Sequence, residues 1–235
     1  MGGITQLGKV FLSLQHITSP GKFTLEVTVN SFSNSWDFWV YPAKKGEIAG
    51  ADRIKIVSVL DPDTKNFLEQ GGAVLLTIRK GSLKPEYGGK IAVGFSTIFW
   101  NMAWTQKQAP HTLGILCDPR HPALAEFPTQ YHSNWQWWDA MSHSVAIDLT
   151  SFPKTLKPIV RVIDDWFTNR PLALLFEASV GKGKVLISGV DLPGDLATRP
   201  EAQQLLYSLV KYMSGNQFNP KVELDVDMIN NLIKL

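Results

Sequence analysis

The chain has 235 residues, of which 44% are hydrophobic and 19% charged, with a formal net charge of +2. This length allows one large domain, or a main domain with an appendage, and a sizeable buried core. The near-neutral charge and the lack of any run of five like charges argue against a nucleic-acid-binding protein. The longest apolar runs are too short to span a bilayer, and the first residues do not have the pattern of a signal peptide.

The first forty residues have the alternating pattern of antiparallel β-strands. Residues 23, 25, 27 and 29 are apolar and alternate with polar residues, which is the signature of a half-buried strand. Similar alternation at residues 10–14 and 36–40 predicts a strand on either side, with turns near residues 19–21 and 30–34. Three strands bury little core, so we expect residues 1–45 to be the remnant of a β-sandwich domain whose other strands lie upstream.

An α/β region begins near Arg53. An apolar run at residues 54–60 is followed by Asp61-Pro62, which suits the start of a helix, and by Gly71-Gly72, which suits its end. A second apolar run at residues 73–78 completes a strand–helix–strand unit, which implies parallel strands with helices on the faces of the sheet. Further strands are predicted at residues 91–93, 112–117, 160–163, 172–179 and 184–190.

The last two predicted strands are joined through Gly181-Lys182-Gly183, which predicts a β-hairpin at one edge of the sheet. Thr198 and Glu201 then have the spacing of a capping box before a helix that ends near residue 214. A tail over residues 216–235 is expected to contain a last helix that packs back. The sequence therefore predicts a three-layer α/β domain with a mainly parallel sheet over residues 50–215, preceded by a few antiparallel strands.

Residues 95–143 are the main candidate for a functional site, because they contain five of the eight tryptophans and four of the five histidines. Indole faces beside amide and imidazole groups could stack on a sugar while hydrogen-bonding its hydroxyl groups. The alternative is an aromatic cluster that buries a loop against the core, since each ring offers about 150–250 Å² of buriable surface. The candidate carbohydrate-binding residues are Trp100, Trp104, His132, Asn134, Trp135, Gln136, Trp137 and Trp138.

Other chemistry is less well supported. Cys117 precedes His121, and cysteine with histidine is a known catalytic pair, but Asp118-Pro119 stands where a nucleophile elbow needs small residues. A single cysteine also excludes an internal disulfide and leaves the redox compartment undecided. The histidines are ten or eleven residues apart, which does not match the spacing of zinc motifs. We expect no metal and no cofactor.

The acidic residues give no clear catalytic pair. Asp164-Asp165 follows a predicted strand, where ligands gather in α/β sheets, but adjacent carboxylates point apart, and a cap for the next helix is the alternative role. Glu177 and Asp191 lie on the predicted hairpin, and a retaining glycosidase would need two carboxyl groups about 5 to 5.5 Å apart. The run at residues 181–184, Gly-Lys-Gly-Lys, lacks the spacing of a phosphate-binding loop and favours a tight turn.

Five segments together resemble the carboxy-terminal region of large glycoside hydrolase family 2-type proteins from gut Bacteroidetes. They are FSNSWDFWVYP at residues 32–42, FWNMAW at 99–104, HTLGILCDP at 111–119, YHSNWQWW at 131–138 and VIDDWF at 162–167. The resemblance covers most of the chain. In such proteins this region follows a sugar-binding sandwich and a catalytic barrel. Its α/β portion is similar to flavodoxin-like class I glutamine amidotransferase domains, including a non-catalytic one in some β-galactosidases that takes part in subunit assembly.

The resemblance implies a non-catalytic accessory module whose partners are the upstream sandwich and barrel domains, with a glycan and a homo-oligomer as further candidates. The parent protein would be periplasmic or on the outer surface. The family's catalytic glutamates belong to a barrel that this chain is too short to contain, and Cys117 departs from the glycine-rich elbow of amidotransferases. Two alternatives stay open: a free-standing carbohydrate-binding module, and a cysteine-dependent hydrolase that uses Cys117.

Overall fold

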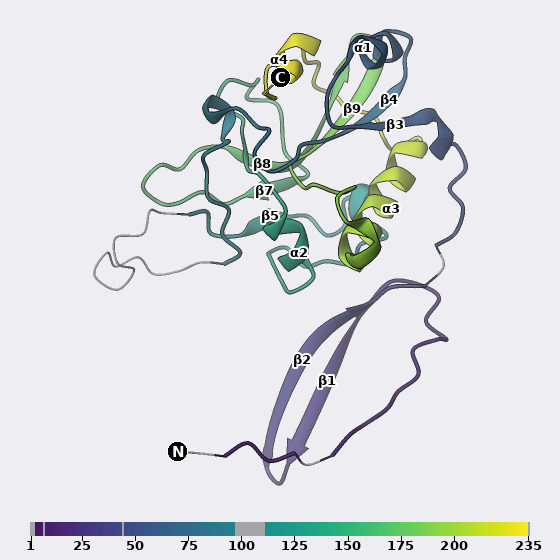
Figure 1. Ribbon diagram of the computed structural model, residues 1–235, viewed down its shortest axis with the longest axis vertical. Coiled ribbons are helices and arrows are strands. Elements are labelled where there is room, and N and C mark those ends of the chain that lie inside the picture. The colour runs from purple at the N-terminus through teal and green to yellow at the C-terminus, as the bar shows by residue number, and fades with distance from the viewer. Residues whose placement is uncertain (1–2, 7, 44, 97–110, 235) are drawn as a thin grey trace.

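The computed structural model describes residues 3–6, 8–43, 45–96 and 111–234, which form an α/β body and a two-stranded ribbon that projects from it (Figure 1). The ribbon consists of the antiparallel strands β1 (Gly21–Val29) and β2 (Phe32–Val40). Asn30 and Ser31 form its tip, and Asn30 has a φ of 54°, a left-handed conformation that asparagine tolerates in tight hairpin turns. The two predicted strands are confirmed, but most of their apolar side chains are exposed and not half-buried as expected.

The prediction of a third strand at residues 10–14 is wrong. These residues form no strand, and the side chains of Val10 and Phe11 are 93% and 91% exposed. An alternating pattern becomes a strand only where its backbone groups find a neighbour to pair with, and no such neighbour lies in the described part of the chain. The predicted strand at residues 91–93 is also absent, because single hydrogen bonds such as Thr112 N–H to the Ala92 carbonyl replace a ladder.

The body is built on one mixed sheet with the strand order β3-β4-β9-β8-β7-β5, and β6 also pairs with β8. Only β3, β4 and β9 are mutually parallel, whereas every other pairing is antiparallel. The strands are β3 (Ile54–Val57), β4 (Ala73–Thr77), β5 (Ile115–Cys117), β6 (Ile147–Asp148), β7 (Val160–Val162), β8 (Leu172–Val180) and β9 (Gly183–Ser188).

The expectation of a mainly parallel sheet is therefore wrong. Parallel neighbours need a long crossover, usually through a helix. The unit of β3, α1 (Pro62–Glu69) and β4 has one, and the predicted Asp61 cap accepts a hydrogen bond from Thr64 N–H at 2.8 Å. By contrast, residues 163–171 between β7 and β8 contain no helix, so the chain returns antiparallel. The predicted hairpin of β8 and β9 is present, but it lies in the middle of the sheet and not at its edge.

Helices cover both faces of the sheet (Figure 1). On one face, α3 (Pro200–Ser214) packs Leu205 and Leu209 against β-strand residues such as Leu75. On the other face, α1 and α4 (Val226–Asn230) enclose a second apolar cluster. The remaining elements are α2 (Trp137–Ser142) and the 3₁₀ turns η1 (Ala51–Arg53), η2 (Pro85–Tyr87), η3 (Pro122–Leu124) and η4 (Leu196–Thr198).

The predicted capping box at the start of α3 does not form. Pro200 occupies the first turn, so the helix begins after Arg199, and the Thr198 hydroxyl donates instead to the Asp195 carbonyl at 3.0 Å. Proline favours this position because its fixed φ suits the first turn and its missing N–H would be unpaired there. The helix start consequently places the Arg199 side chain beneath the loop that follows β9.

We predict that Gly88→Ala destabilises the body much more than Gly50→Ala. Both glycines have positive φ values, 107° and 81°, where an alanine is strained by about 1 kcal/mol. A Cβ at Gly88 would in addition overlap the carbonyl of Ala146, whereas a Cβ at Gly50 meets open space. Urea unfolding of the two variants measures the difference, and equal losses would show that the close approach at Gly88 does not constrain the fold.

Candidate functional site

Trp137, at the start of α2, is an internal anchor. Its side chain is fully buried, its Nε1–H donates to the Thr129 hydroxyl at 2.6 Å, and its ring packs edge-to-face on Phe127 with centroids 5.1 Å apart. For Trp137, the structure therefore matches the alternative interpretation, in which aromatic side chains bury the segment against the core. Trp137 is therefore removed from the candidate carbohydrate-binding residues, because no ligand can reach a ring in this position.

Trp135 and Trp138 lie on the outside of the same segment, 67% and 52% exposed. Their ring centroids are 5.8 Å apart, and Phe95 stacks on Trp135 at 5.4 Å while meeting Trp138 edge-on at 5.2 Å. These three rings, Phe95, Trp135 and Trp138, form what we call the aromatic surface. Clustered aromatic side chains that are exposed to solvent are candidates for ligand contact.

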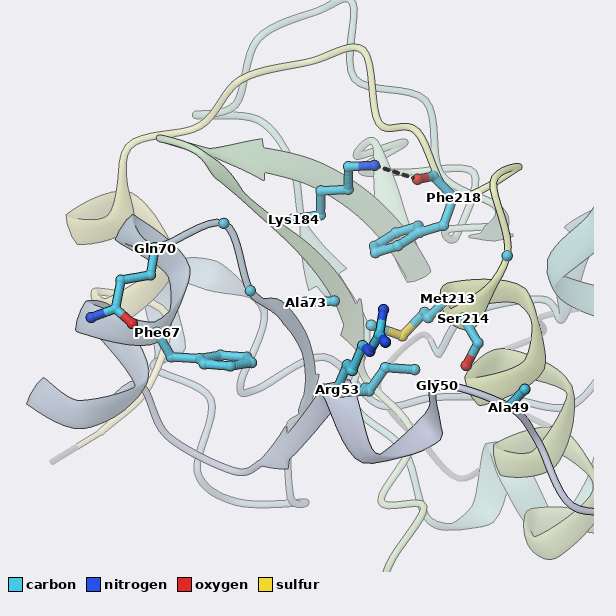
Figure 2. Close-up of a pocket in the computed structure, with 14 residues that line it drawn as sticks. Ala49, Gly50, Arg53, Phe67, Gln70, Ala73, Lys184, Met213, Ser214 and Phe218 are labelled. Atoms are coloured by element: carbon cyan, nitrogen blue, oxygen red, sulfur yellow. Dashed lines mark hydrogen bonds between the residues drawn. The ribbon is translucent and has the colours of Figure 1, made fainter.

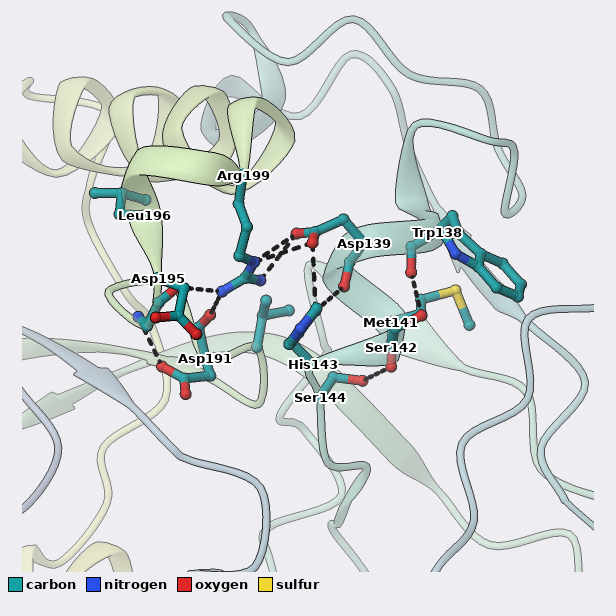
Figure 3. A network of polar contacts seen from close by, with 12 residues as sticks. Trp138, Asp139, Met141, Ser142, His143, Ser144, Asp191, Asp195, Leu196 and Arg199 are labelled. Carbon is teal, nitrogen blue, oxygen red and sulfur yellow. Dashed lines mark hydrogen bonds and ion pairs between the residues drawn. The ribbon is translucent and has the colours of Figure 1, made fainter.

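A buried ion pair fixes the helix that carries this surface (Figure 3). Arg199 donates from Nε to the Asp139 carboxylate at 3.0 Å, and its Nη2 lies 2.9 Å from the same group. Its Nη1 donates to the carbonyls of Asp191 and Gly194, each at 2.7 Å. Trp138, next to Asp139 in the chain, points away from this network. The ion pair therefore ties α2 to the start of α3 and leaves the Trp138 ring facing outward.

His143 completes the network without forming a catalytic triad. Its Nδ1 lies 3.3 Å from an Asp139 oxygen that Arg199 already holds. The neighbouring hydroxyls of Ser142 and Ser144 donate to the backbone carbonyls of Trp138 and Met141, at 2.7 and 2.8 Å. A nucleophilic serine needs its hydroxyl bonded to the base. These contacts assign the network a positioning role.

The polar residues predicted to bind carbohydrate also differ in their exposure to solvent. His132 is exposed and Asn134 is half-buried, with its Nδ2 donating to Gln130 at 3.3 Å. Gln136 is only 1% exposed and is therefore also removed from the candidate set. Trp100 and Trp104 lie outside the described residues.

Phe95, which lies 40 residues before Trp135 in the chain, is not among the residues predicted for the site. A signal that separates the exposed tryptophans from the buried one is present in the sequence. Trp135 and Trp138 are three residues apart, which puts their side chains on one side of a helical turn and leaves Trp137 on another. Gln136, between them, has helical backbone angles (φ −60°, ψ −33°), so this spacing acts one residue before α2 begins.

Cys117 lies at the end of β5 as an inert thiol. It is 5% exposed, it donates to the Gln130 carbonyl at 3.3 Å, and burial raises its pKa to about 11. Burial also lowers the pKa of His121, whose Nδ1 accepts a hydrogen bond from Ala123 N–H. A catalytic cysteine is activated by a lowered thiol pKa, so this environment works against the cysteine-hydrolase alternative.

The carboxylates outside the network are also held by neighbours. Asp164 accepts three hydrogen bonds from Arg170, at 2.7 to 2.9 Å, and Asp165 accepts backbone N–H groups of the following turn. Glu177 accepts the Tyr212 hydroxyl at 2.7 Å, and burial raises the pKa of its carboxyl group. Glu177 and Cys117 line the same cavity, which has a volume of 510 Å³. The other carboxylate that lines this cavity, Asp118, pairs with Arg120 at 3.1 Å.

A cavity of 640 Å³ lies at the amino-terminal ends of β3, β4 and β9 (Figure 2). Arg53 and Lys184 give it a positive lining, and the Lys184 ammonium donates to the Phe218 carbonyl at 2.9 Å. The carboxyl ends of α1 and α3 also reach this cavity, at Gln70 and Ser214, and their partial negative charge offsets the two cations. Ligands of α/β sheets bind at the opposite strand ends, so this cavity is not our candidate.

Within the described ranges, no three histidine, cysteine, aspartate or glutamate side chains come together as metal ligands. No helix there is both long and apolar enough to cross a membrane. The arrangement that does stand out is an α/β body that holds a rigid, solvent-facing group of aromatic rings.

The chain belongs to the family described as "Domain of unknown function (DUF8487)", whose model matches residues 55–234. A second model, "Domain of unknown function (DUF8488)", matches residues 1–42, which include the ribbon. No curated protein matches the chain. Among solved structures, it is similar to the cytoplasmic protein STM3548 from Salmonella typhimurium, with 10% identity and a TM-score of 0.32 over 83% of this chain and 96% of that one.

We predict that Asp139→Ala lowers the free energy of unfolding by about 3–5 kcal/mol, because it leaves the Arg199 guanidinium buried without a counter-charge. The side chains of Arg199 and Asp139 are only 6% and 18% exposed. The matched control is Asp118→Ala, which removes the partner of Arg120 in a solvent-exposed pair and should change little. Urea denaturation provides both values. Similar small losses would contradict the anchoring role of the buried pair.

Alkylation of Cys117 by iodoacetamide at pH 8 should be very slow in the folded chain and fast in urea. At a pKa of about 11 only about one thiol in a thousand is ionised at this pH, and the group is also shielded from the reagent. Mass spectrometry against time measures the rate. Rapid modification of the native protein would restore Cys117 as a candidate nucleophile.

Proposed function

We propose that this chain is a non-catalytic accessory module of a carbohydrate-active enzyme, and that its aromatic surface contacts a glycan. The observation that carries the proposal is the pair of exposed indoles, Trp135 and Trp138, presented by a segment whose other side is anchored by Trp137 and Asp139. A rigid aromatic pair binds with little loss of conformational entropy, because the side chains are ordered before the ligand arrives.

The chemistry of the aromatic surface suits a sugar. The faces of the indole rings carry partial negative charge, and the C–H groups on one side of a pyranose ring carry partial positive charge. Exposed His132 and half-buried Asn134 lie in the same segment and offer nitrogen and oxygen atoms to hydroxyl groups. The combination of apolar rings with a few polar groups is typical of a site for an amphipathic ligand.

The geometry also favours one kind of glycan. The planes of Trp135 and Trp138 are inclined by 55°, so the two rings form an angled surface and not a flat strip. A flat crystalline polysaccharide can stack on only one of two rings inclined in this way. A single soluble chain can place one sugar ring on one indole and turn its neighbour toward the other. We therefore propose a soluble oligosaccharide or polysaccharide as the ligand.

Three features support a module without its own catalysis. The Asp139 and Asp164 carboxylates are engaged by arginines, the Glu177 carboxyl is bonded to Tyr212, and the Cys117 thiol is neutral. The resemblance to glycoside hydrolase family 2-type proteins supplies the enzyme class of the parent, with sandwich and barrel domains as partners. The helix–sheet–helix layering supports a distant relation to glutamine amidotransferase-like domains, from which the many antiparallel pairings depart.

A glycan array followed by titration calorimetry tests the proposal. We expect binding to a soluble polysaccharide fragment that falls by about tenfold or more in Trp135→Ala and in Trp138→Ala, since each removes one stacking ring. Phe167→Ala is the matched control, because Phe167 is an exposed aromatic residue outside the aromatic surface, 71% accessible. The affinity of Phe167→Ala for the glycan should equal that of the unchanged chain.

Two results would contradict the proposal. One is equal binding by all three variants, or no binding to any glycan on the array. The other is release of nitrophenol from a panel of nitrophenyl glycosides by the pure chain, abolished when one carboxylate is replaced.

A further inference from the structure

The ribbon of β1 and β2 has one wholly uncharged face. The strand register places Phe23 opposite Phe38, Leu25 opposite Trp36 and Val29 opposite Phe32, so these pairs share one side. We call this side the apolar ribbon face. Its residues are Phe23, Leu25, Val27, Val29, Phe32, Asn34, Trp36, Phe38 and Val40.

The apolar ribbon face is open to water. Leu25, Trp36 and Phe32 are 52%, 50% and 79% exposed. The exposed apolar area on this face is on the order of 600 Å², given the size of aromatic and aliphatic side chains. Continuous apolar patches of this size on monomers usually mark an interaction site.

Polar side chains on the opposite face of the ribbon bond to one another across the two strands. Lys22 pairs with Asp37 at 2.9 Å, and the Thr24 hydroxyl donates to the same carboxylate at 2.7 Å. Thr28 and Ser33 share a hydrogen bond of 2.7 Å across the strands. Because these polar groups are compatible with water, the opposite face needs no cover.

The body of the same chain does not cover the apolar ribbon face. The ribbon projects from the body (Figure 1), and it is held at its base by a hydrogen bond from Trp39 Nε1–H to the Pro128 carbonyl, 3.0 Å long, and by stacking of Tyr41 on Phe127. None of the described residues among the first 43 is buried. An isolated two-stranded ribbon is marginal in water and needs a second layer.

We propose that the second layer is the apolar ribbon face of another copy of this chain, in place of the upstream sandwich strands expected from the sequence, so that two ribbons stack into a four-stranded, two-layer unit. The face has no charged residue, and stacking it on itself brings no like charges together. About 600 Å² from each copy approaches the roughly 800 Å² per partner of a standard interface. Exposed Phe11 and Leu12, in the segment that precedes the ribbon, offer further apolar area.

The position of the body determines how the copies stack. A two-fold axis that runs along the Leu25–Trp36 row sends the two bodies to opposite ends of the stacked ribbons, where they cannot collide. Phe32 at each ribbon tip then lies over the Gly21–Val40 row at the base of the other ribbon, beside the stacked pair of Phe23 and Phe38, whose ring centroids are 5.9 Å apart. Sheets in such sandwiches lie about 10 Å apart. The result is an elongated dimer, an assembly that uses a different surface from the proposed glycan contact.

Sedimentation velocity on the full chain tests this assembly. We expect a monomer–dimer equilibrium in the micromolar range, with a frictional ratio typical of an elongated dimer. Trp36→Glu should abolish the dimer, because it would bury a charge at the centre of the interface. Ser35→Lys is the control on the opposite face of the same strand, where the new charge lies opposite Glu26, and it should dimerise normally. Circular dichroism verifies that the body of each variant is folded.

Cross-linking provides a test that does not depend on a disruptive substitution. Because the proposed axis passes through the Leu25 row, Leu25→Cys places two thiols close together across the interface, and a short bis-maleimide should link the copies. Glu26→Cys, on the opposite face, should not be linked at the same concentration. A chain that remains monomeric at 100 µM or more, or a dimer that Trp36→Glu leaves intact, or equal linking of both cysteine variants, would overturn the proposal.

Discussion

The ion pair between Arg199 and Asp139 is the interaction on which the candidate site depends. The guanidinium lies beneath the loop after β9, where it also donates hydrogen bonds to two backbone carbonyls, and the carboxylate comes from a helix of only six residues. Such a short helix has little stability of its own. Its orientation is determined by this ion pair on one side and by the buried indole of Trp137 on the other. Only with both anchors in place does Trp138 face solvent.

This arrangement explains how one short segment can have two roles. Two adjacent residues of the segment, Gln136 and Trp137, lie in the core, and the residues on either side of them, Trp135 and Trp138, lie in water. The aromatic-core interpretation therefore applies to Trp137, and our proposal of ligand binding concerns Trp135 and Trp138. The buried residues provide the rigidity that a binding surface needs, and the exposed ones provide its chemistry.

The sequence predicted those elements whose signals are local. The Asp61 cap and Pro62 located α1, and the alternation in residues 21–40 located the ribbon with its apolar side. Sheet topology was less accessible, because the direction of β5 and β7 depends on pairings between distant segments and not on the apolar runs themselves. For the candidate site, periodicity could have separated Trp137 from its neighbours. The contribution of Phe95 could not have been found, since only tertiary packing brings it to Trp135.

The central claim is that Trp135 and Trp138 form a solvent-facing surface that a glycan covers while Trp137 anchors the helix. Oxidation of the folded chain with a limited amount of N-bromosuccinimide, followed by peptide mass spectrometry, measures all three indoles in one experiment. The account predicts rapid oxidation of Trp135 and Trp138, slow oxidation of Trp137, and selective protection of the first two by a bound oligosaccharide. Equal, slow oxidation of all three residues would contradict it.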